Sequence, residues 1–147
     1  MNDHLDAIML IMEQAFDHAY GEAWTRRQVA DSLVFPGTHY LLDTDGDSGE
    51  PRGFVLSRSA ADEEELLLIA VRPQFRDAGV GADLMRRFLD AAGERGIAKV
   101  FLEMRADNPA AHLYRKFGFE KIGVRNGYYR GAIGGPLDAI TFALSLK

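Results

Sequence analysis

The most distinctive pattern in the chain is a run of six apolar residues at 66–71, followed by an amphipathic segment that begins at Val80. A continuous apolar run of this length predicts a strand that is buried on both faces. From residue 80 to 93 the apolar residues recur at helical spacing, which predicts a helix with one buried face. Because Gly79 and Gly81 lie between the two patterns, segment 71–82 is predicted to be a strand-to-helix turn.

Comparable patterns along the rest of the chain predict further helices and strands. Apolar spacing predicts helices over 4–20 and from Asn108 to Phe117, and the capping-box pair Thr25 and Gln28 predicts a helix that Pro36 ends. Strands are predicted at 40–42, 53–57, 99–104, 119–124 and 138–146, with loops at 43–51 and 125–135. Residues 62–65 are predicted to form a solvated acidic edge.

The order of these elements predicts an α/β (α+β) fold with a mixed sheet. The strand, helix and strand over 66–104 form a right-handed crossover unit, so its two strands are expected to be parallel. The length of 147 residues suits a single domain over 1–147 with a hydrophobic core.

Composition excludes several classes of protein. The chain contains no cysteine, which excludes disulfides, thiolate catalysis and cysteine-bound zinc. No apolar run approaches the roughly 20 residues of a membrane span, and the N-terminus lacks the pattern of a signal peptide. The net charge of −5 argues against a nucleic-acid partner and favours a basic one. We therefore expect a cytoplasmic protein that binds neither nucleic acid nor membrane.

The turn at 71–82 is a candidate anion site. Backbone N–H groups at a helix N-terminus are unpaired and carry partial positive charge, and glycines allow a phosphate to approach closely. Arg76 adds a full positive charge. An ordinary turn would use the same glycines, so this segment alone leaves both interpretations open. It is not a Walker loop, because no Gly-Lys-Ser/Thr follows, and it is not a dinucleotide fingerprint, because Leu84 stands where a third glycine is expected.

Polar residues after the buried strands are candidates for chemistry. Glu103 interrupts the apolar run at 99–104, near the strand end where ligands of α/β sheets bind. It could face the turn at 71–82, or form an ion pair with Arg105 or Arg72. Tyr114 could belong to the core with its hydroxyl at the rim, and Asn108 could be a helix cap. No histidine has a partner at metal-binding spacing, so no metal site is expected.

Two motifs together resemble the GNAT acetyltransferases. Arg76-x-x-Gly79-x-Gly81-Ala82 is similar to the acyl-CoA signature of that family, and residues 108–119, with a Leu-Tyr and a Gly-Phe, are similar to its second signature. Residues 102–108, the pair Tyr128-Tyr129 and Asp138-Ala139-Ile140 resemble the RimI-type ribosomal-protein alanine N-acetyltransferases.

This resemblance implies a fold, a reaction and roles for matching residues. It implies a mostly antiparallel mixed sheet with a central parallel strand pair and about four helices. It also implies acetyl-CoA as co-substrate, no metal, and the N-terminal segment of a ribosomal protein as acceptor. Glu103 matches the general base and Tyr114 the general acid. The cofactor-binding positions that it implies are Ile69, Ala70, Val71, Arg76, Asp77, Ala78, Gly79, Val80, Gly81, Ala82 and Asn108.

Three departures from the family pattern leave alternatives open. One residue fewer separates Asn108 from Tyr114 than is usual, so Asp107 could hold the asparagine position instead. The usual first strand is expected to be short or absent, and residues 131–136 are unusual in composition and are expected to line the amine side. The acceptor could therefore also be a lysine side chain or a small amine, and a non-catalytic acyl-CoA-binding module is a further alternative.

Overall fold

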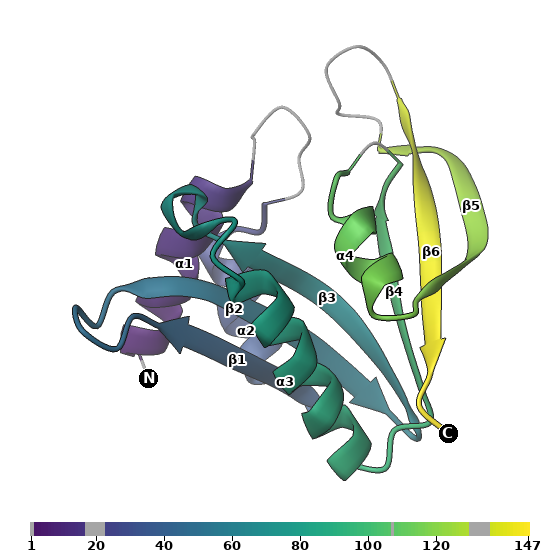
Figure 1. The fold of residues 1–147 in the computed structure, drawn as a ribbon, viewed down its shortest axis with the longest axis horizontal. Coiled ribbons are helices and arrows are strands. Elements are labelled where there is room, and N and C mark those ends of the chain that lie inside the picture. The colour runs from purple at the N-terminus through teal and green to yellow at the C-terminus, as the bar shows by residue number, and fades with distance from the viewer. Residues whose placement is uncertain (1, 17–22, 107, 130–135) are drawn as a thin grey trace.

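The computed structural model describes residues 2–16, 23–106, 108–129 and 136–147, and within them a single six-stranded sheet carries helices on both faces (Figure 1). The strands are β1 (Thr38–Thr44), β2 (Pro51–Ala60), β3 (Glu63–Val71), β4 (Lys99–Arg105), β5 (Glu120–Tyr129) and β6 (Leu137–Ser145). The helices are α1 (Asn2–Ala15), α2 (Arg26–Leu33), η2 (Pro73–Phe75), α3 (Val80–Glu94) and α4 (Ala111–Lys116). None of the described helices is long and apolar enough to cross a membrane.

The sheet is mixed, as the sequence predicts. Its strand order is β1-β2-β3-β4-β6-β5, so the last strand of the chain inserts between β4 and β5. Only β3 and β4 are parallel, and every other neighbouring pair is antiparallel. The predictions of a parallel central pair, a mostly antiparallel sheet and four α-helices are confirmed.

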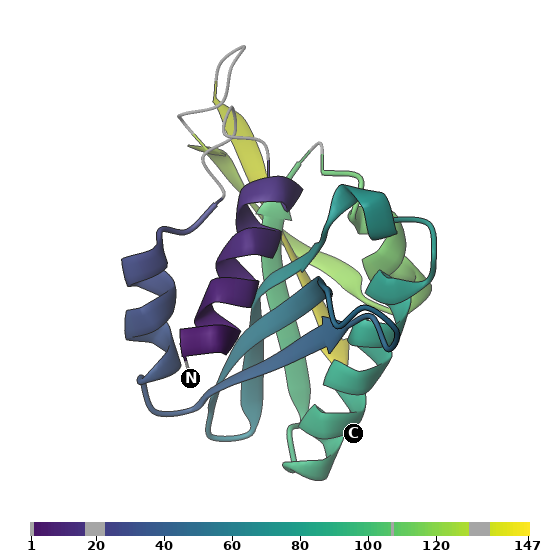
Figure 2. The ribbon, with the colours of Figure 1, turned by 90° about the vertical axis from the view of Figure 1, so that its left-hand side faces the viewer.

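The helices form two outer layers, which Figure 2 shows edge-on. Helices α1 and α2 cover one face, where buried side chains of both helices pack on β2 and β3: Ile8, Ile11, Met12, Val29, Phe54, Leu56 and Ala70. Helices α3 and α4 cover the other face with a larger cluster that includes Leu66, Leu84, Phe88, Leu102, Tyr114 and Phe142. Residues of β3 contribute to both clusters, because successive side chains of a strand point to opposite faces.

The parallel pair is short, and its shortness shapes the site. Strand β3 pairs with β4 only from Glu63 to Leu66, against residues 99–102. Beyond Leu66 the two strands part, and Figure 1 shows them diverging toward their carboxyl ends. In the described part of the chain, the edge of β3 that faces β4 therefore has no strand partner over 67–71.

Close packing holds α3 against β2 and β3. A Cβ atom at Gly53 would lie 2.8 Å from the backbone oxygen of Ala70 and 2.9 Å from Leu84 Cδ1. Only glycine fits such an approach, so Gly53 lets helix α3 sit directly over the strand ends.

The prediction of a solvated acidic edge at 62–65 is wrong at Glu64, although Asp62 and Glu63 are exposed. Strand β3 begins at Glu63, and the Glu64 side chain is fully buried. Its carboxylate accepts hydrogen bonds from Ser57 Oγ at 2.6 Å and from the guanidinium of Arg95, which comes from the end of α3. A buried carboxylate with a bidentate arginine partner avoids the desolvation cost that an acidic run would otherwise incur. The sequence could not show this partner, because Arg95 lies 31 residues away.

Other boundaries differ from the predicted ones. Helix α1 ends at Ala15, and Phe16 already lies outside it; the rest of the predicted helix, 17–20, lies outside the described residues. The predicted loop at 125–135 is wrong over 125–129, which belong to β5, while 130–135 lie outside the described residues. Polar residues and Gly127 suggested a loop, but Asp138 Oδ1 accepts a hydrogen bond from Gly127 N–H at 2.8 Å and bridges an irregular stretch of the β5–β6 ladder.

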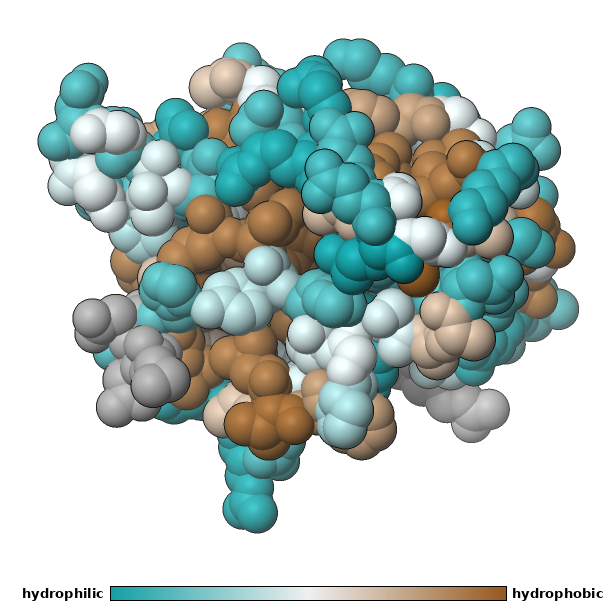
Figure 3. Space-filling view, turned by 90° about the horizontal axis from the view of Figure 1, so that it is seen from below, coloured by the Kyte–Doolittle hydropathy of each residue, from teal (hydrophilic) through white to brown (hydrophobic). Residues whose placement is uncertain are grey.

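The described residues contain no strand between Asn2 and Thr38. The predicted capping box is present, with Thr25 and Gln28 each accepting a backbone N–H from the other. Seen from below, the surface shows several apolar patches among hydrophilic residues (Figure 3).

Candidate active site

The predicted anion site lies at the start of α3, where the chain turns after β3. Gly79 is the N-cap of α3 with a φ of 82°, a left-handed conformation that favours glycine. The first intrahelical donor is Asp83 N–H, bonded to Gly79 O at 3.0 Å. The N–H groups of Val80, Gly81 and Ala82 precede it in the first turn, where an α-helix offers no acceptor. Together with the exposed residues Asp77, Ala78 and Gly79, this turn has the features of an anion-binding helix N-terminus.

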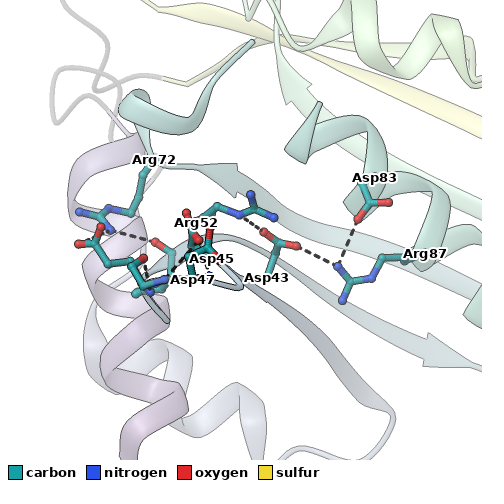
Figure 4. Close-up of polar contacts among 10 residues, drawn as sticks. Asp43, Asp45, Asp47, Arg52, Arg72, Asp83 and Arg87 are labelled. Carbon is teal, nitrogen blue, oxygen red and sulfur yellow. Dashed lines mark hydrogen bonds and ion pairs between the residues drawn. The ribbon is translucent and has the colours of Figure 1, made fainter. Parts of the chain in front are cut away.

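Salt bridges fix this end of α3 to the sheet (Figure 4). The buried carboxylate of Asp43 on β1 accepts from Arg52 Nε at 2.6 Å and from Arg87 Nη1 at 3.2 Å. Arg87 also reaches Asp83 Oδ2 at 3.4 Å, one turn back along the helix. The start of α3 is thereby held over β1 and β2.

The end of β3 supplies the next predicted contacts. The side chains of Ile69 and Val71 pack into the cluster beneath α3, and Ala70 packs into the cluster beneath α1. Their backbone is hydrogen-bonded to β2 on one side only in the described structure, since pairing with β4 stops at Leu66. A Cβ atom added at Gly81 would lie within ordinary contact distance of the Val71 and Leu113 side chains, so Gly81 is next to this strand end.

Glu103 lies on β4 just beyond the point where the parallel pairing ends. Its neighbours Leu102 and Met104 are buried beneath α3, so alternation turns Glu103 to the other face, the face of α1 and α2. Its side chain is 18% exposed, and Oε2 accepts from Arg125 Nε at 2.9 Å. The hydroxyl of Thr141 on β6 lies 3.4 Å from the same oxygen.

The partner of Glu103 is Arg125, whereas the sequence suggested Arg105 or Arg72. Arg125 lies on β5, which the sequence analysis took to be a loop at that point. Its guanidinium also lies over the Tyr128 ring, 4.6 Å from the centroid. Strands β5 and β6 place Arg125 opposite Ala139. The only sequence signal for the contact with Glu103 would have been the alternation of inward and outward side chains along these two strands.

A second carboxyl group lies on the same face as Glu103. Burial raises the pKa of Glu65 on β3, and the negative charge of Glu103 raises it further. The positive charges of Arg58 and Arg125 act in the opposite direction. Glu65 is the direct cross-strand partner of Arg58 on β2. In the sequence, Glu65 is the last residue of the acidic run at 62–65, and nothing in that run marks it as part of a site.

Tyr114 lies on the opposite face from Glu103. Its side chain is 6% exposed within the cluster beneath α3 and α4. Its ring packs edge-on against Phe119, with centroids 6.0 Å apart, and tilted against Phe142 at 6.2 Å. The ring is therefore part of the core, in agreement with the alternative interpretation, and a role for its hydroxyl remains a prediction.

Two predicted coenzyme contacts have protein partners of their own. Asn108 Oδ1 accepts from Ala110 N–H at 2.9 Å in a turn that precedes α4. The N-cap of α4 is Ala110, without a side-chain cap bond, so the alternative that Asn108 caps this helix is wrong; Asp107 lies outside the described residues. The guanidinium of Arg76 donates to two backbone oxygens, Val71 O at 3.2 Å and Ala15 O at 2.9 Å.

Two other features of the described residues do not coincide with these positions. A hollow of about 310 Å³ between α2 and β2 is lined by Trp24, Gln28, Asp31, Ser32, Phe35 and Arg58. It contains none of the predicted site residues, so we give it no part in the chemistry. Among the described residues, no group of three or more acidic or histidine side chains is placed to hold a metal ion.

Comparison with known proteins identifies the family. Residues 5–119 match the model of the acetyltransferase (GNAT) family. The chain is 33% identical to the "[Ribosomal protein bS18]-alanine N-acetyltransferase" of Escherichia coli over 130 residues, covering 88% of this chain and 85% of the relative. It is 37% identical over 114 residues to the "N-alpha-acetyltransferase RimI" of Mycobacterium tuberculosis, covering 74% of this chain and 69% of the relative.

The structural comparison agrees with the sequence comparison. The crystal structure of the ribosomal-protein-S18-alanine N-acetyltransferase from Escherichia coli superposes with a TM-score of 0.88 at 30% identity, covering 100% of this chain and 90% of that one. The resemblance inferred from the two motifs is thus confirmed. The chain belongs to the acetyltransferase (GNAT) family and is an acetyl-CoA-dependent N-acetyltransferase.

Proposed function

We propose that this enzyme acetylates the N-terminal α-amine of a protein, and that a ribosomal protein is its physiological acceptor. The observation that carries the proposal is the parting of β3 and β4 beyond Leu66, with the α3 N-terminus on one face of the sheet and Glu103 on the other. The names of the Escherichia coli and Mycobacterium tuberculosis relatives support an α-amine acceptor.

The coenzyme side of the reaction would use backbone groups. The N–H groups from residue 77 to Ala82 would bind the pyrophosphate, with the positive end of the α3 dipole favouring its charge. The unpaired edge at Ile69, Ala70 and Val71 would run beside the pantetheine arm and hydrogen-bond it as a neighbouring strand would. The Val71 N–H would then donate to the thioester oxygen as negative charge develops there.

The amine side would use Glu103. Acetyl-CoA supplies an acetyl group activated as a thioester; the amine nitrogen forms a bond to the carbonyl carbon, and the carbon–sulfur bond breaks. Glu103 would take the proton that the nitrogen loses, directly or through a water molecule. The Tyr114 hydroxyl would give a proton to the departing sulfur, so that the products are an acetylated N-terminus and free coenzyme A.

An α-amine suits this site better than a lysine does. With a pKa near 7.7–8.0, roughly a tenth to a fifth of a terminal amine is neutral at pH 7, whereas a lysine amine is neutral only about 0.04% of the time. A single carboxylate has correspondingly less deprotonation to perform on an α-amine. The net charge of −5 also favours a basic acceptor, which describes most ribosomal proteins.

Thiol release from acetyl-CoA tests the proposal. The acceptors would be N-terminal peptides of ribosomal proteins, including the bS18 counterpart, the same peptides with a blocked α-amine and a free internal lysine, and a set of polyamines and aminoglycosides. We expect thiol release with the free α-amines, and mass spectrometry should locate the acetyl group at the first residue. Release only with blocked peptides or small amines would contradict the proposal.

A further inference from the structure

Two arginines tie the coenzyme loop to the end of α1. Arg72 and Arg76 flank the short helix η2, which follows β3 and leads into the turn at Gly79. Both side chains reach back to the last turn of α1, more than 55 residues earlier in the chain. Figure 1 shows this segment lying beside the end of α1, and Figure 4 shows Arg72 alongside that helix.

Arg72 is the buried member of the pair. Its side chain is 7% exposed, its Nε donates to Gln14 Oε1 at 2.8 Å, and its Nη1 donates to Pro51 O at 2.9 Å. The guanidinium also lies 5.5 Å from the Phe75 ring centroid. A single side chain thus joins α1, the start of β2 and η2.

Arg76 is the exposed member, and it completes the end of α1. The last carbonyl groups of a helix have no intrahelical donor, and a cation there is favoured by the helix dipole. Helix α1 has no basic residue in its own last turn. Arg76 Nη2 donates to Ala15 O at 2.9 Å, while its Nε donates to Val71 O at 3.2 Å.

These contacts change the role expected for Arg76. Its two donor atoms are directed at backbone oxygens, one at the end of α1 and the other at the end of β3. The loop that would bind pyrophosphate is consequently joined to the helix that covers the amine face of the sheet, the face on which Glu103 lies.

We propose that Arg76, supported by Arg72, is a positioning residue that couples the coenzyme loop to α1, and that it does not bind phosphate through its side chain. The proposal rests on the proposed acetyl transfer. It assigns Arg76 to the alignment of the two substrates, because the same guanidinium holds the Val71 backbone beside the thioester and the helix on the amine side.

Acetyl-pantetheine, which lacks the pyrophosphate, separates positioning from phosphate binding. We expect Arg76→Ala to lower kcat by about 10-fold to 10²-fold, because a small misplacement of reacting groups has effects of that size. The loss should be the same with acetyl-CoA and with acetyl-pantetheine, and the KM for acetyl-CoA should change little. A phosphate ligand would behave differently: the KM for acetyl-CoA would rise and the defect would vanish with acetyl-pantetheine, which would overturn the proposal.

Matched variants separate a loss of positioning from the loss of a positive charge alone. Arg86→Ala removes an exposed cation from α3 that pairs with Asp83 and not with α1, and it should retain wild-type kcat. Gln14→Ala removes the α1 partner of Arg72 and should show the same kind of defect as Arg76→Ala, only smaller. Arg76→Lys should not rescue, because a point-like ammonium cannot span both carbonyl groups as the guanidinium does.

Hydrogen exchange tests the coupling without any acceptor amine. Addition of coenzyme A to the wild type should protect amides of the α3 N-terminus and also those of residues 12–16 at the end of α1. In Arg76→Ala the protection should remain at α3 and be lost at α1. Equal protection of α1 in both proteins, or none in the wild type, would overturn the coupling, whereas failure of the α-amine proposal would appear only in the peptide assay.

Discussion

The charge of Glu103 is balanced before any substrate is bound. Arg125 holds one carboxylate oxygen at 2.9 Å, and its own side chain is 59% exposed on the edge strand β5. An incoming ammonium group would compete with this exposed guanidinium for the same oxygen. The exposure of Arg125 makes such an exchange feasible, since an ion pair open to water contributes little net stability.

Replacing Tyr114 by Phe tests its role as the acid. If its hydroxyl protonates the departing sulfur, Tyr114→Phe should slow acetyl transfer by about 10²–10⁴-fold. The ring contacts with Phe119 and Phe142 would remain, so the substitution removes the hydroxyl alone. Tyr40→Phe, which removes a surface hydroxyl bonded to His4 on the outer strand β1, is the control. A Tyr114→Phe rate equal to that of the wild type would leave Tyr114 as a core residue only.

Glu65 should make stability depend on pH. Burial raises its pKa above the ordinary value of a glutamate, and the negative charge of Glu103 raises the pKa further. The folded state therefore binds the proton more tightly than the unfolded chain does. The contribution of Glu65 to stability is complete below the unfolded pKa and is lost as pH rises through the higher folded pKa.

Glu65→Gln cannot ionise, so it should be more stable than the wild type at about pH 7 and similar to it at about pH 4. Denaturant titrations of both proteins at the two pH values would measure this difference. The same stability difference at both values would show that ionisation of Glu65 has no influence on folding.

At the level of elements, β3 joins two different environments. Its first half pairs with both β2 and β4 and contains the buried Glu64, whereas its second half pairs only with β2. The ladder to β2 is irregular between these halves, where Leu56 faces Leu68 and Ser57 faces Leu66. The strand is thus anchored at one end by a charge network and left open at the other, where the substrates are proposed to meet.

The anchor can be tested by removing Arg95. Arg95→Ala would leave the fully buried carboxylate of Glu64 without its counter-charge but still bonded to Ser57, and breaking a buried pair in this way costs about 3–5 kcal/mol. Equilibrium denaturation should show a loss of this size. Adding Glu64→Gln should recover part of it, because the neutral amide needs no counter-charge.

Arg27→Ala provides the comparison for an exposed pair. Arg27 Nε lies 3.9 Å from Asp31 Oδ2, and both side chains are largely in water. Loss of the Arg27 side chain should therefore change the free energy of unfolding by less than about 1 kcal/mol. If Arg95→Ala were as mild as Arg27→Ala, the buried network would not anchor β3.

What the sequence reveals about these elements depends on the range of the interactions. The amphipathic period of α3, the apolar run of β3 and the Thr25–Gln28 box are local patterns, and the corresponding elements were predicted correctly. Contacts such as Glu64–Arg95 and Glu103–Arg125 join distant segments, and no local pattern marks them. Glu103 was a candidate because a charged residue interrupts an apolar run. Its partner Arg125 lies in a segment whose polar residues and glycine are typical of a loop.

At the scale of the whole molecule, the sheet separates two functional layers. Helices α3 and α4 lie on the side proposed for coenzyme A, and α1 and α2 lie on the side of Glu103 (Figure 2). The two faces of the sheet meet where β3 and β4 separate. The motifs predicted that acyl-CoA would bind near Gly79 and Gly81. They did not predict the insertion of β6 between β4 and β5, or the hydrogen bond from Arg76 to the end of α1. Those features arise from packing among elements far apart in the chain.

The role proposed for Glu103 is to accept the proton of an amine that attacks a thioester held where β3 and β4 separate. Its most direct test is the pH dependence of acetyl transfer to a peptide with a free α-amine, measured for the wild type, Glu103→Gln and the exposed control Glu94→Gln. Below the amine pKa of about 7.7–8.0 the acceptor is mostly protonated and needs a base, whereas above it the amine is already neutral. We predict that Glu103→Gln loses most activity at low pH, approaches the wild type at high pH and keeps its affinity for acetyl-CoA, while Glu94→Gln follows the wild type throughout. A Glu103→Gln profile with the same pH dependence as the wild type would contradict the claim.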